Sequence, residues 1–290
     1  MSLLLSPAAA ARADYPDPAW PDLLPSAPVG DQRDVRSVPG CPAASIDCVD
    51  AVIDEMIDRW RPLDRSCDFR AVFALTYLRT TQGFRRALAR NDPAFNDRSW
   101  VILLDAKFAD LYFRAYDAYR HHDLGKVPPA WRIAFDAATR KETWAGQDIF
   151  LGMNAHIQRD LPVALYRMGL VDKRGGSHRE DHNRVNRILA RVLDPIEREV
   201  SRRYDPIVGQ LDQAAGPGDE VGALQTVKSW REGAWRNAER LASARDKESR
   251  KRVMESIEQC AKTWAELIMQ GKIPGHPRER DAYCLSHRGV

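Results

Sequence analysis

Residues 97–121 read DRSWVILLDAKFADLYFRAYDAYRH, and this stretch decides the fold class. Its apolar side chains recur every three or four residues, which predicts a long helix with one wide apolar stripe. Asp105 lies inside that stripe, and a carboxyl group among apolar neighbours needs a partner. Asp105 is therefore a candidate functional residue; a shared metal would supply its partner, and Arg231 is an alternative, structural one. Tyr112 lies further along the same helix, where it is expected to line the same cavity.

The same helical period recurs on both sides of this stretch. One helix is expected to begin after Ser45 and end before Pro62, and two long amphipathic helices are expected over 221–242 and 252–270. Alternating strand patterns and fixed-period repeats are almost absent. The sequence therefore predicts an all-α fold, a single helical domain of about eight to ten helices with a Pro-rich N-terminal arm.

Changes in composition along the sequence divide the chain into three parts. Residues 1–44 are rich in proline and are expected to form an extended or disordered arm. Residues 45–270 make up the helical domain, and 271–290 form a polar C-terminal tail. Gly216-Pro217-Gly218 is the clearest internal linker.

Composition limits the class of protein. The 290 residues carry a net charge of +3, which is too weak for a dedicated nucleic-acid binder. No apolar stretch approaches the ~18–20 residues that span a bilayer. The N-terminal sequence MSLLLSPAAAARA ends like a signal-peptide cleavage site but lacks a basic first region. We expect a cytoplasmic protein with a small-molecule substrate and with no nucleic-acid or membrane partner; the sequence does not indicate its oligomeric state.

The cysteines support the same location. Their number, five, is odd, and no Cys-x-x-Cys spacing occurs. This pattern favours unpaired thiols in a reducing compartment over a disulfide framework or a zinc ribbon. Cys41 and Cys48 are close enough in sequence to pair if the protein is exported.

Residues 152–162, GMNAHIQRDLP, are the most promising segment for chemistry. His156 and Asp160 are four residues apart and share one face of a helix. They are candidates for a metal-binding pair or for an acid–base dyad in which Asp160 fixes the imidazole tautomer; a purely structural hydrogen bond is the alternative. Pro162 is expected to kink or restart the helix. Asn154 lies on another face and would join the site only if the helix is irregular.

A second polar cluster lies at the start of a predicted helix. His178, Asp181 and His182 share one helical face, and these residue types are typical metal ligands. The alternative is that the acidic residues of a first turn stabilise the helix dipole. Signature motifs for dinucleotides, for nucleoside phosphates, for serine hydrolases and for HExxH metalloproteases are missing.

The residues quoted above resemble an uncharacterised, mainly actinobacterial family, a domain of unknown function whose hallmark is Gly-Met-Asn-Ala-His-Ile-x-Arg-Asp-Leu-Pro. The string stands intact over 152–162, and weaker matching pieces extend over about 49–241. The resemblance supports Asp105, His156, Asp160 and Asp181 as site residues. It also draws attention to Asn186 and Arg231. His182 and Asp110 depart from the family pattern.

A more distant resemblance is to the zinc-dependent phospholipase C and single-strand nuclease superfamily. His156, Asp160 and Pro162 are similar to its His-x3-Asp zinc pair followed by a proline. The superfamily's histidine after the proline and its N-terminal tryptophan ligand have no counterpart. The resemblance implies an all-helical fold and a zinc site.

Three hypotheses follow. The first is a metal-dependent hydrolase in which zinc or another divalent metal activates water; its ligands would be His156, Asp160, Asp105, Asp181 and His178. The second is a metal-free cyclase or lyase of specialised metabolism, in which the His156–Asp160 dyad moves protons. The third is a non-enzymatic helical scaffold. In either enzyme, the residues expected to bind substrate are Asn154, Tyr112, Asn186 and Arg231.

Overall fold

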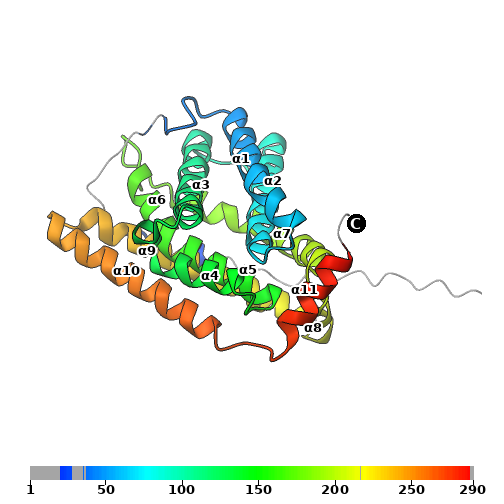
Figure 1. Ribbon diagram of the computed structural model, residues 1–290. Coiled ribbons are helices and arrows are strands. Elements are labelled where there is room, and N and C mark those ends of the chain that lie inside the picture. Colours follow the sequence, from blue (N-terminus) through cyan, green and yellow to red (C-terminus); the bar gives the residue numbers. More distant parts are fainter. Residues whose placement is uncertain (1–19, 28–34, 36, 216, 288–290) are drawn as a thin grey trace, which may run out of the picture.

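The computed structural model describes residues 20–27, 35, 37–215 and 217–287, which form a single all-α domain (Figure 1). Its α-helices are α1 (Ile46–Arg65), α2 (Arg70–Arg90), α3 (Arg98–Arg120), α4 (Pro129–Thr139), α5 (Ala145–Met153), α6 (Leu161–Met168), α7 (Arg179–Arg203), α8 (Ile207–Ala215), α9 (Pro217–Ser243), α10 (Lys247–Ile268) and α11 (His276–Ser286). Two short 3-10 helices are η1 (Trp20–Leu23) and η2 (Leu124–Lys126), and η3 (Asn154–Asp160) is a π-helix.

The predicted fold class is confirmed. The described residues contain no β-strand, only isolated bridges that pair Val38 with Cys41 and Val171 with Ser177. Within the described ranges, no helix has the length and apolar character needed to cross a membrane.

The π-helical segment lies at the centre of the domain. It contacts α3, α4, α5, α6, α9 and α10, while α2 packs between α1 and α7 (Figure 1). Large apolar side chains around these contacts are fully buried, among them Trp131, Trp235, Leu75, Leu151 and Leu165. The chain therefore holds η3 between helices that are far apart in sequence.

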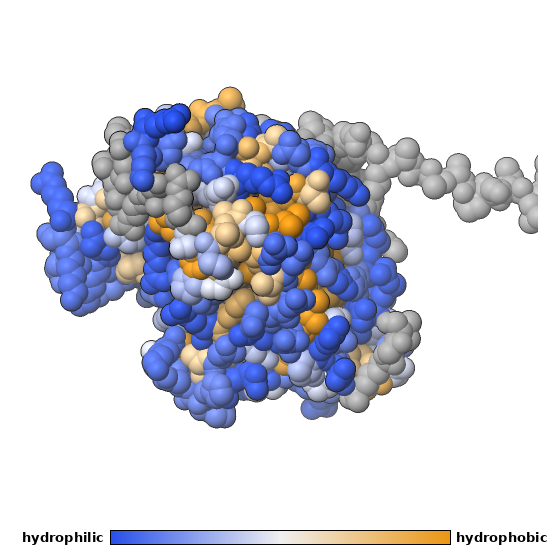
Figure 2. All heavy atoms as spheres, turned by 90° about the horizontal axis from the view of Figure 1, so that it is seen from above, coloured by the Kyte–Doolittle hydropathy of each residue, from blue (hydrophilic) through white to orange (hydrophobic). Residues whose placement is uncertain are grey.

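The surface is much more polar than this interior. Figure 2 shows one face on which hydrophilic residues predominate and hydrophobic ones gather toward the middle. The large apolar side chains that remain exposed in the described part lie at the end of η1 and on α8, α10 and α11; they are Leu23, Leu24, Leu211, Trp264, Leu267 and Leu285. Most of the apolar residues thus pack around η3 and its neighbours.

Two helix boundaries differ from the predictions. Helix α1 continues through Pro62 to Arg65, so the expected end before Pro62 is wrong by about one turn. Proline removes a single hydrogen-bond donor, and the packed last turn tolerates that loss. The predicted Gly-Pro-Gly linker is also wrong, because only residue 216 separates α8 from α9 and Pro217 is the first residue of α9. Proline is favourable at a first helical position.

The chain ends pack onto the helical domain where they are described. The indole N–H of Trp20 donates to Gln225 Oε1 at 2.8 Å, and Asn183 Nδ2 donates to Asp22 Oδ1 at 2.8 Å. Residues 1–19, 28–34 and 36 of the predicted arm lie outside the described residues. The predicted polar tail contains α11, whose buried Arg280 forms an ion pair with Asp148.

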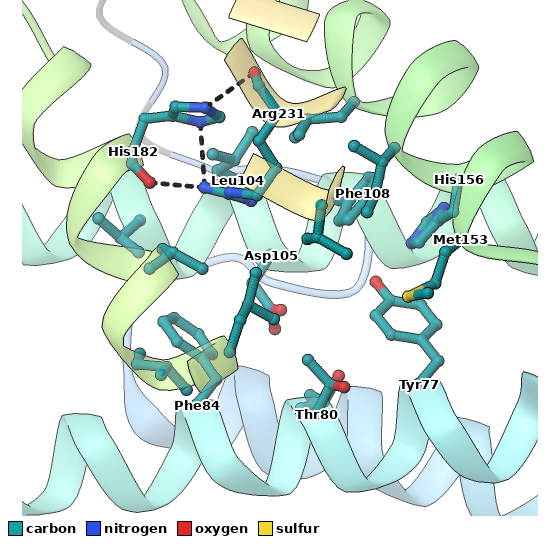
Figure 3. A pocket seen from close by; sticks show the side chains of 18 of the residues that line it. Tyr77, Thr80, Phe84, Leu104, Asp105, Phe108, Met153, His156, His182 and Arg231 are labelled. Atoms are coloured by element: carbon teal, nitrogen blue, oxygen red, sulfur yellow. Dashed lines mark hydrogen bonds between the residues drawn. The ribbon is translucent and has the colours of Figure 1, made fainter. Parts of the chain in front are cut away.

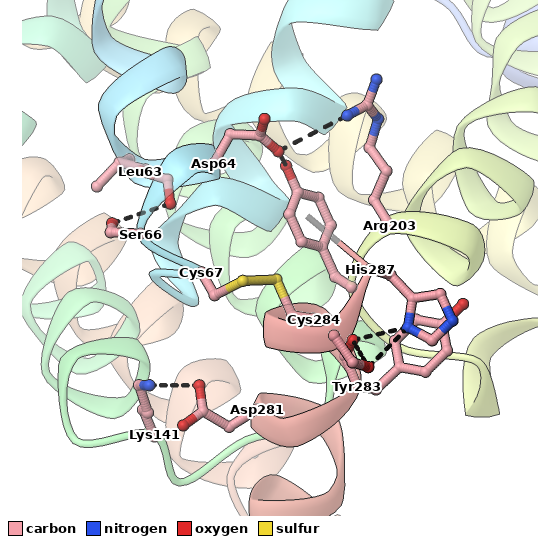
Figure 4. Close-up of a disulfide and its surroundings, with 12 residues drawn as sticks. Leu63, Asp64, Ser66, Cys67, Lys141, Arg203, Asp281, Tyr283, Cys284 and His287 are labelled. Atoms are coloured by element: carbon pink, nitrogen blue, oxygen red, sulfur yellow. Dashed lines mark hydrogen bonds and ion pairs between the residues drawn. A yellow bond between two sulfur atoms is a disulfide. The ribbon is translucent and has the colours of Figure 1, made fainter. Parts of the chain in front are cut away.

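Two disulfides correct the prediction of unpaired thiols. Cys41 pairs with Cys48, and Cys67 pairs with Cys284 and joins α11 to the end of α1 (Figure 4). Cys260 is free and exposed. The second pair spans 217 residues, and a pairing between cysteines so far apart cannot be read from sequence spacing.

Candidate functional site

The π-helix η3 ends two residues before Pro162, the last residue of the 152–162 string. Proline has no N–H to donate to the carbonyl oxygen four residues earlier, so the α-helical pattern cannot run unbroken through this point. Helix α5 ends at Met153, the turns of η3 are wider, and α6 begins at Leu161 with Pro162 in its first turn. The expected restart at Pro162 is confirmed. Single π-helical turns inside α-helices are frequent at functional sites.

The side chains of His156 and Asp160 contact each other within this segment. His156 Nδ1 lies 3.1 Å from Asp160 Oδ2, and both side chains are buried. Asp160 also accepts hydrogen bonds from Trp131 Nε1 and Arg159 Nη1, each at 2.8 Å. Since these partners can only donate, the carboxylate acts as the acceptor and His156 Nδ1 carries a proton. The imidazole lone pair is therefore on Nε2.

Aromatic rings fix the plane of the imidazole. The Phe108 ring stacks on His156 with centroids 3.5 Å apart, and the Tyr77 ring meets it edge-on at 4.4 Å. Burial lowers the pKa of His156, although the hydrogen bond and the charge of Asp160 oppose that shift. The neutral form is thus favoured near pH 7, with Nε2 as a proton acceptor.

His156 lines a mostly apolar cavity. The cavity lies between α2, α3, η3, α7 and α9, is partly open to solvent, and leaves about 120 Å³ for the centres of water-sized molecules. Figure 3 shows Asp105 near the middle, with Tyr77, Met153 and His156 on one side and His182 and Arg231 on the other.

Four residues that line this cavity each have a buried polar atom without a hydrogen-bond partner among the described residues. The atoms are Tyr77 Oη, Thr81 Oγ1, Asp105 Oδ2 and His156 Nε2, and Figure 3 shows the side chains of Tyr77, Asp105 and His156. Buried polar atoms without partners are costly and uncommon, so their gathering in one cavity points to a ligand that would satisfy them.

Burial also changes the acidity of two of these groups. It raises the pKa of Asp105 to about 7, so that a large fraction of this carboxyl group is protonated at neutral pH. The pKa of the Tyr77 hydroxyl is raised as well, by burial and by the nearby charges of Asp105 and Asp160. Tyr77 and protonated Asp105 can therefore both donate hydrogen bonds into the cavity.

Asp105, His156 and Asp181, three of the expected metal ligands, line the same cavity, but their side chains do not form one cluster among the described residues. Asp181 accepts hydrogen bonds from the backbone N–H groups of Asn96 and Asp97 at 2.8 and 2.7 Å and so orders the start of α3. The ring of His178 stacks on Trp100, with centroids 4.4 Å apart. In the described part of the chain, no three His, Cys, Asp or Glu side chains form a group that could hold a metal. The donors around Asp160 likewise leave it poorly suited to bind a cation.

The expected substrate-binding residues lie in different places. Asn154 Nδ2 donates to the carbonyl of Ala261 on α10 at 2.8 Å, so its side chain points away from the cavity. Tyr112 is buried among the aromatic rings around His156. Arg231 lines the cavity, and Asn186 accepts a hydrogen bond from its Nε at 2.7 Å.

Sequence reasoning missed two residues of the site. Tyr77 lies on the apolar face of α2, where its spacing is that of an ordinary packing residue. Trp131 belongs to one of the weaker family pieces, yet its indole N–H holds Asp160. An i, i+4 relation reveals neither residue, because each reaches the site from another helix.

The chain belongs to a family of unknown function, DUF5995, whose model matches residues 49–271. No curated protein and no solved structure matches it. The matched range includes every residue of the cavity described above.

Proposed function

We propose that this member of a family of unknown function is an enzyme that moves a proton on a mostly apolar small molecule. The observation that carries the proposal is the gathering of Tyr77 Oη, Asp105 Oδ2 and His156 Nε2, all without partners among the described residues, in one apolar cavity. An apolar cavity with a few converging polar groups and a raised carboxyl pKa is typical of an active site.

The proposed roles follow from protonation. His156 Nε2 removes a proton from a carbon next to a substrate carbonyl, and Asp160 stabilises the imidazolium that forms. Protonated Asp105 and Tyr77 donate hydrogen bonds to the carbonyl oxygen as it becomes negative. His156 then returns the proton to another atom of the same molecule. Atoms and charges balance, and the overall reaction is an isomerisation, or the first step of a cyclisation or elimination.

Metal-dependent hydrolysis is a weaker proposal for this site. A metal on Asp160 would compete with the hydrogen-bond donors Trp131, His156 and Arg159, and no group of three His, Cys, Asp or Glu side chains among the described residues could complete its coordination. Metal analysis of protein purified without a His tag tests it. A stoichiometric zinc, iron or manganese that is lost in His156→Ala would support hydrolysis, whereas metal-free protein that is active would exclude it.

Deuterium exchange tests the proton-transfer proposal while the substrate is still unidentified. Carbonyl compounds that displace the neutral dye Nile red from the protein are incubated with it in deuterated water. We expect the wild-type protein to exchange a C–H proton of at least one such ligand, as detected by mass spectrometry. His156→Gln should lower the exchange rate about 100-fold or more, because general-base catalysis is lost.

The matched control is His121→Gln, since His121 is an exposed histidine at the end of α3. It should exchange at the wild-type rate. Ligands that bind and are neither exchanged nor converted by the wild-type protein would show that the cavity belongs to a binding protein.

A further inference from the structure

Arg231 is the one lysine or arginine among the described residues that line the cavity. It lies on α9 and is only 6% exposed. Its Nε donates to Asn186 Oδ1 at 2.7 Å, and its Nη2 donates to the carbonyl oxygen of His182 at 2.5 Å. No described residue accepts a hydrogen bond from Nη1. These neutral acceptors orient the guanidinium group and leave its charge unbalanced.

Other buried arginines of the domain have carboxylate partners. Arg179 pairs with Glu232 at 2.7 Å, and Arg280 pairs with Asp148 at 2.6 Å. Among the described residues, no carboxylate lies within 4.0 Å of Arg231. A buried cation without an anion is costly, so its place in a cavity wall is a second, independent sign of a ligand.

Asp105 does not fill this role, although it lines the same cavity. Burial alone raises the pKa of Asp105 to about 7 and lowers that of Arg231 to about 9. Paired charges would shift both values in the opposite directions. The neighbouring His182 adds no negative charge, and its own pKa is lowered by burial and by the charge of Arg231.

We infer that the cavity takes an amphipathic monocarboxylate, with its carboxylate on Arg231 and its apolar body extending past Phe108 toward His156. This inference rests on the proposed function, because it defines the substrate class of the same cavity. One guanidinium group balances one negative charge, and a carboxylate matches its planar pair of donors. Figure 3 shows Arg231 and His156 on different sides of the cavity, so the charged end would lie apart from the reacting end.

A series of ligands that differ only in charge tests this inference on the unaltered protein. Octanoate, octan-1-ol and octylammonium are titrated by calorimetry at pH 7. We expect octanoate to bind about tenfold to 100-fold more tightly than octan-1-ol, the usual gain from a charge-assisted hydrogen bond. Octylammonium should bind more weakly than either. The comparison does not depend on the folding of a variant.

Arg231→Gln then locates the effect. It should abolish the preference for octanoate over octan-1-ol while leaving the binding of the alcohol within about threefold. The matched control is Arg240→Gln, an exposed arginine on the same helix, which should keep the full preference.

Three results would overturn the inference: equal binding of octanoate and octan-1-ol, a preference that survives in Arg231→Gln, or no binding of either ligand. The proposed function is judged separately, by deuterium exchange. Exchange without a carboxylate preference would leave the proton-transfer chemistry in place and remove only the substrate class.

Discussion

Asp105 combines a cost in stability with a proposed role in function. Its Oδ2 has no partner among the described residues, and its pKa of about 7 results from burial alone. The folded protein therefore holds a proton at this site over a pH range in which the unfolded chain has released it. An acid whose pKa is raised on folding stabilises the fold fully below its unfolded value near 4 and loses that contribution as the pH rises through 7.

Asp105→Asn should therefore be more stable than the wild type at pH 8, by on the order of 2–4 kcal/mol, and the difference should shrink toward pH 4.5. Urea unfolding at pH 4.5, 6 and 8 measures this difference. A constant difference at all three values would show that Asp105 does not titrate in this range.

The pKa shifts of His156 and Asp105 together predict how the rate of deuterium exchange depends on pH. The reaction requires neutral His156, whose pKa is lowered by burial, and protonated Asp105. The rate should be highest slightly below pH 7 and fall above it. Asp105→Asn should be slower, by on the order of tenfold, and lose the fall above pH 7, because its amide donates at every pH. An unchanged alkaline fall in this variant would assign that step to another group.

At the scale of the helices, the site depends on a close approach of α5 to α2. An added Cβ at Gly152 would lie 2.1 Å from the Phe73 ring, and that ring packs beside His156. Gly152→Ala should cost about 1–3 kcal/mol in urea unfolding, because a packed ring must move. Gly233 on α9 has nothing within 4 Å of the same position, so Gly233→Ala should gain about 0.5–1 kcal/mol. An unchanged free energy of unfolding in Gly152→Ala would show that α5 and α2 are packed more loosely.

Helical periodicity predicted the helices themselves better than the contacts between side chains of different helices. The restart at Pro162 and the contact between His156 and Asp160 follow from local rules, because proline lacks a donor and residues four apart share a helix face. The roles of Trp131 and Tyr77 depend on how helices cross. The same limit applies to Asp181, because its backbone partners precede α3 and cannot be read from the spacing of its own helix.

At the scale of the whole molecule, the two disulfides bear on the compartment in which the chain folds. Disulfides are typical of proteins that fold in an oxidising compartment. The cytoplasmic location expected from the N-terminal sequence therefore needs a direct test. Protein isolated from its native cells, denatured and alkylated without reductant should take up one alkyl group, on Cys260, and five after reduction. Uptake of five alkyl groups without reduction would instead support a cytoplasmic location.

The Cys67–Cys284 bond should be a major support of the fold, because it closes a loop of 217 residues and ties α11 to the domain (Figure 4). Cross-linking a long loop removes much of the conformational freedom of the unfolded chain. The double variant Cys67→Ser, Cys284→Ser should lose about 3–5 kcal/mol in urea unfolding. Cys260→Ser, which alters an exposed free thiol, should change the stability by less than about 0.5 kcal/mol. If the double variant matched this control, the ion pair of Arg280 with Asp148 and the packing of α11 would by themselves hold the C-terminal helix in place.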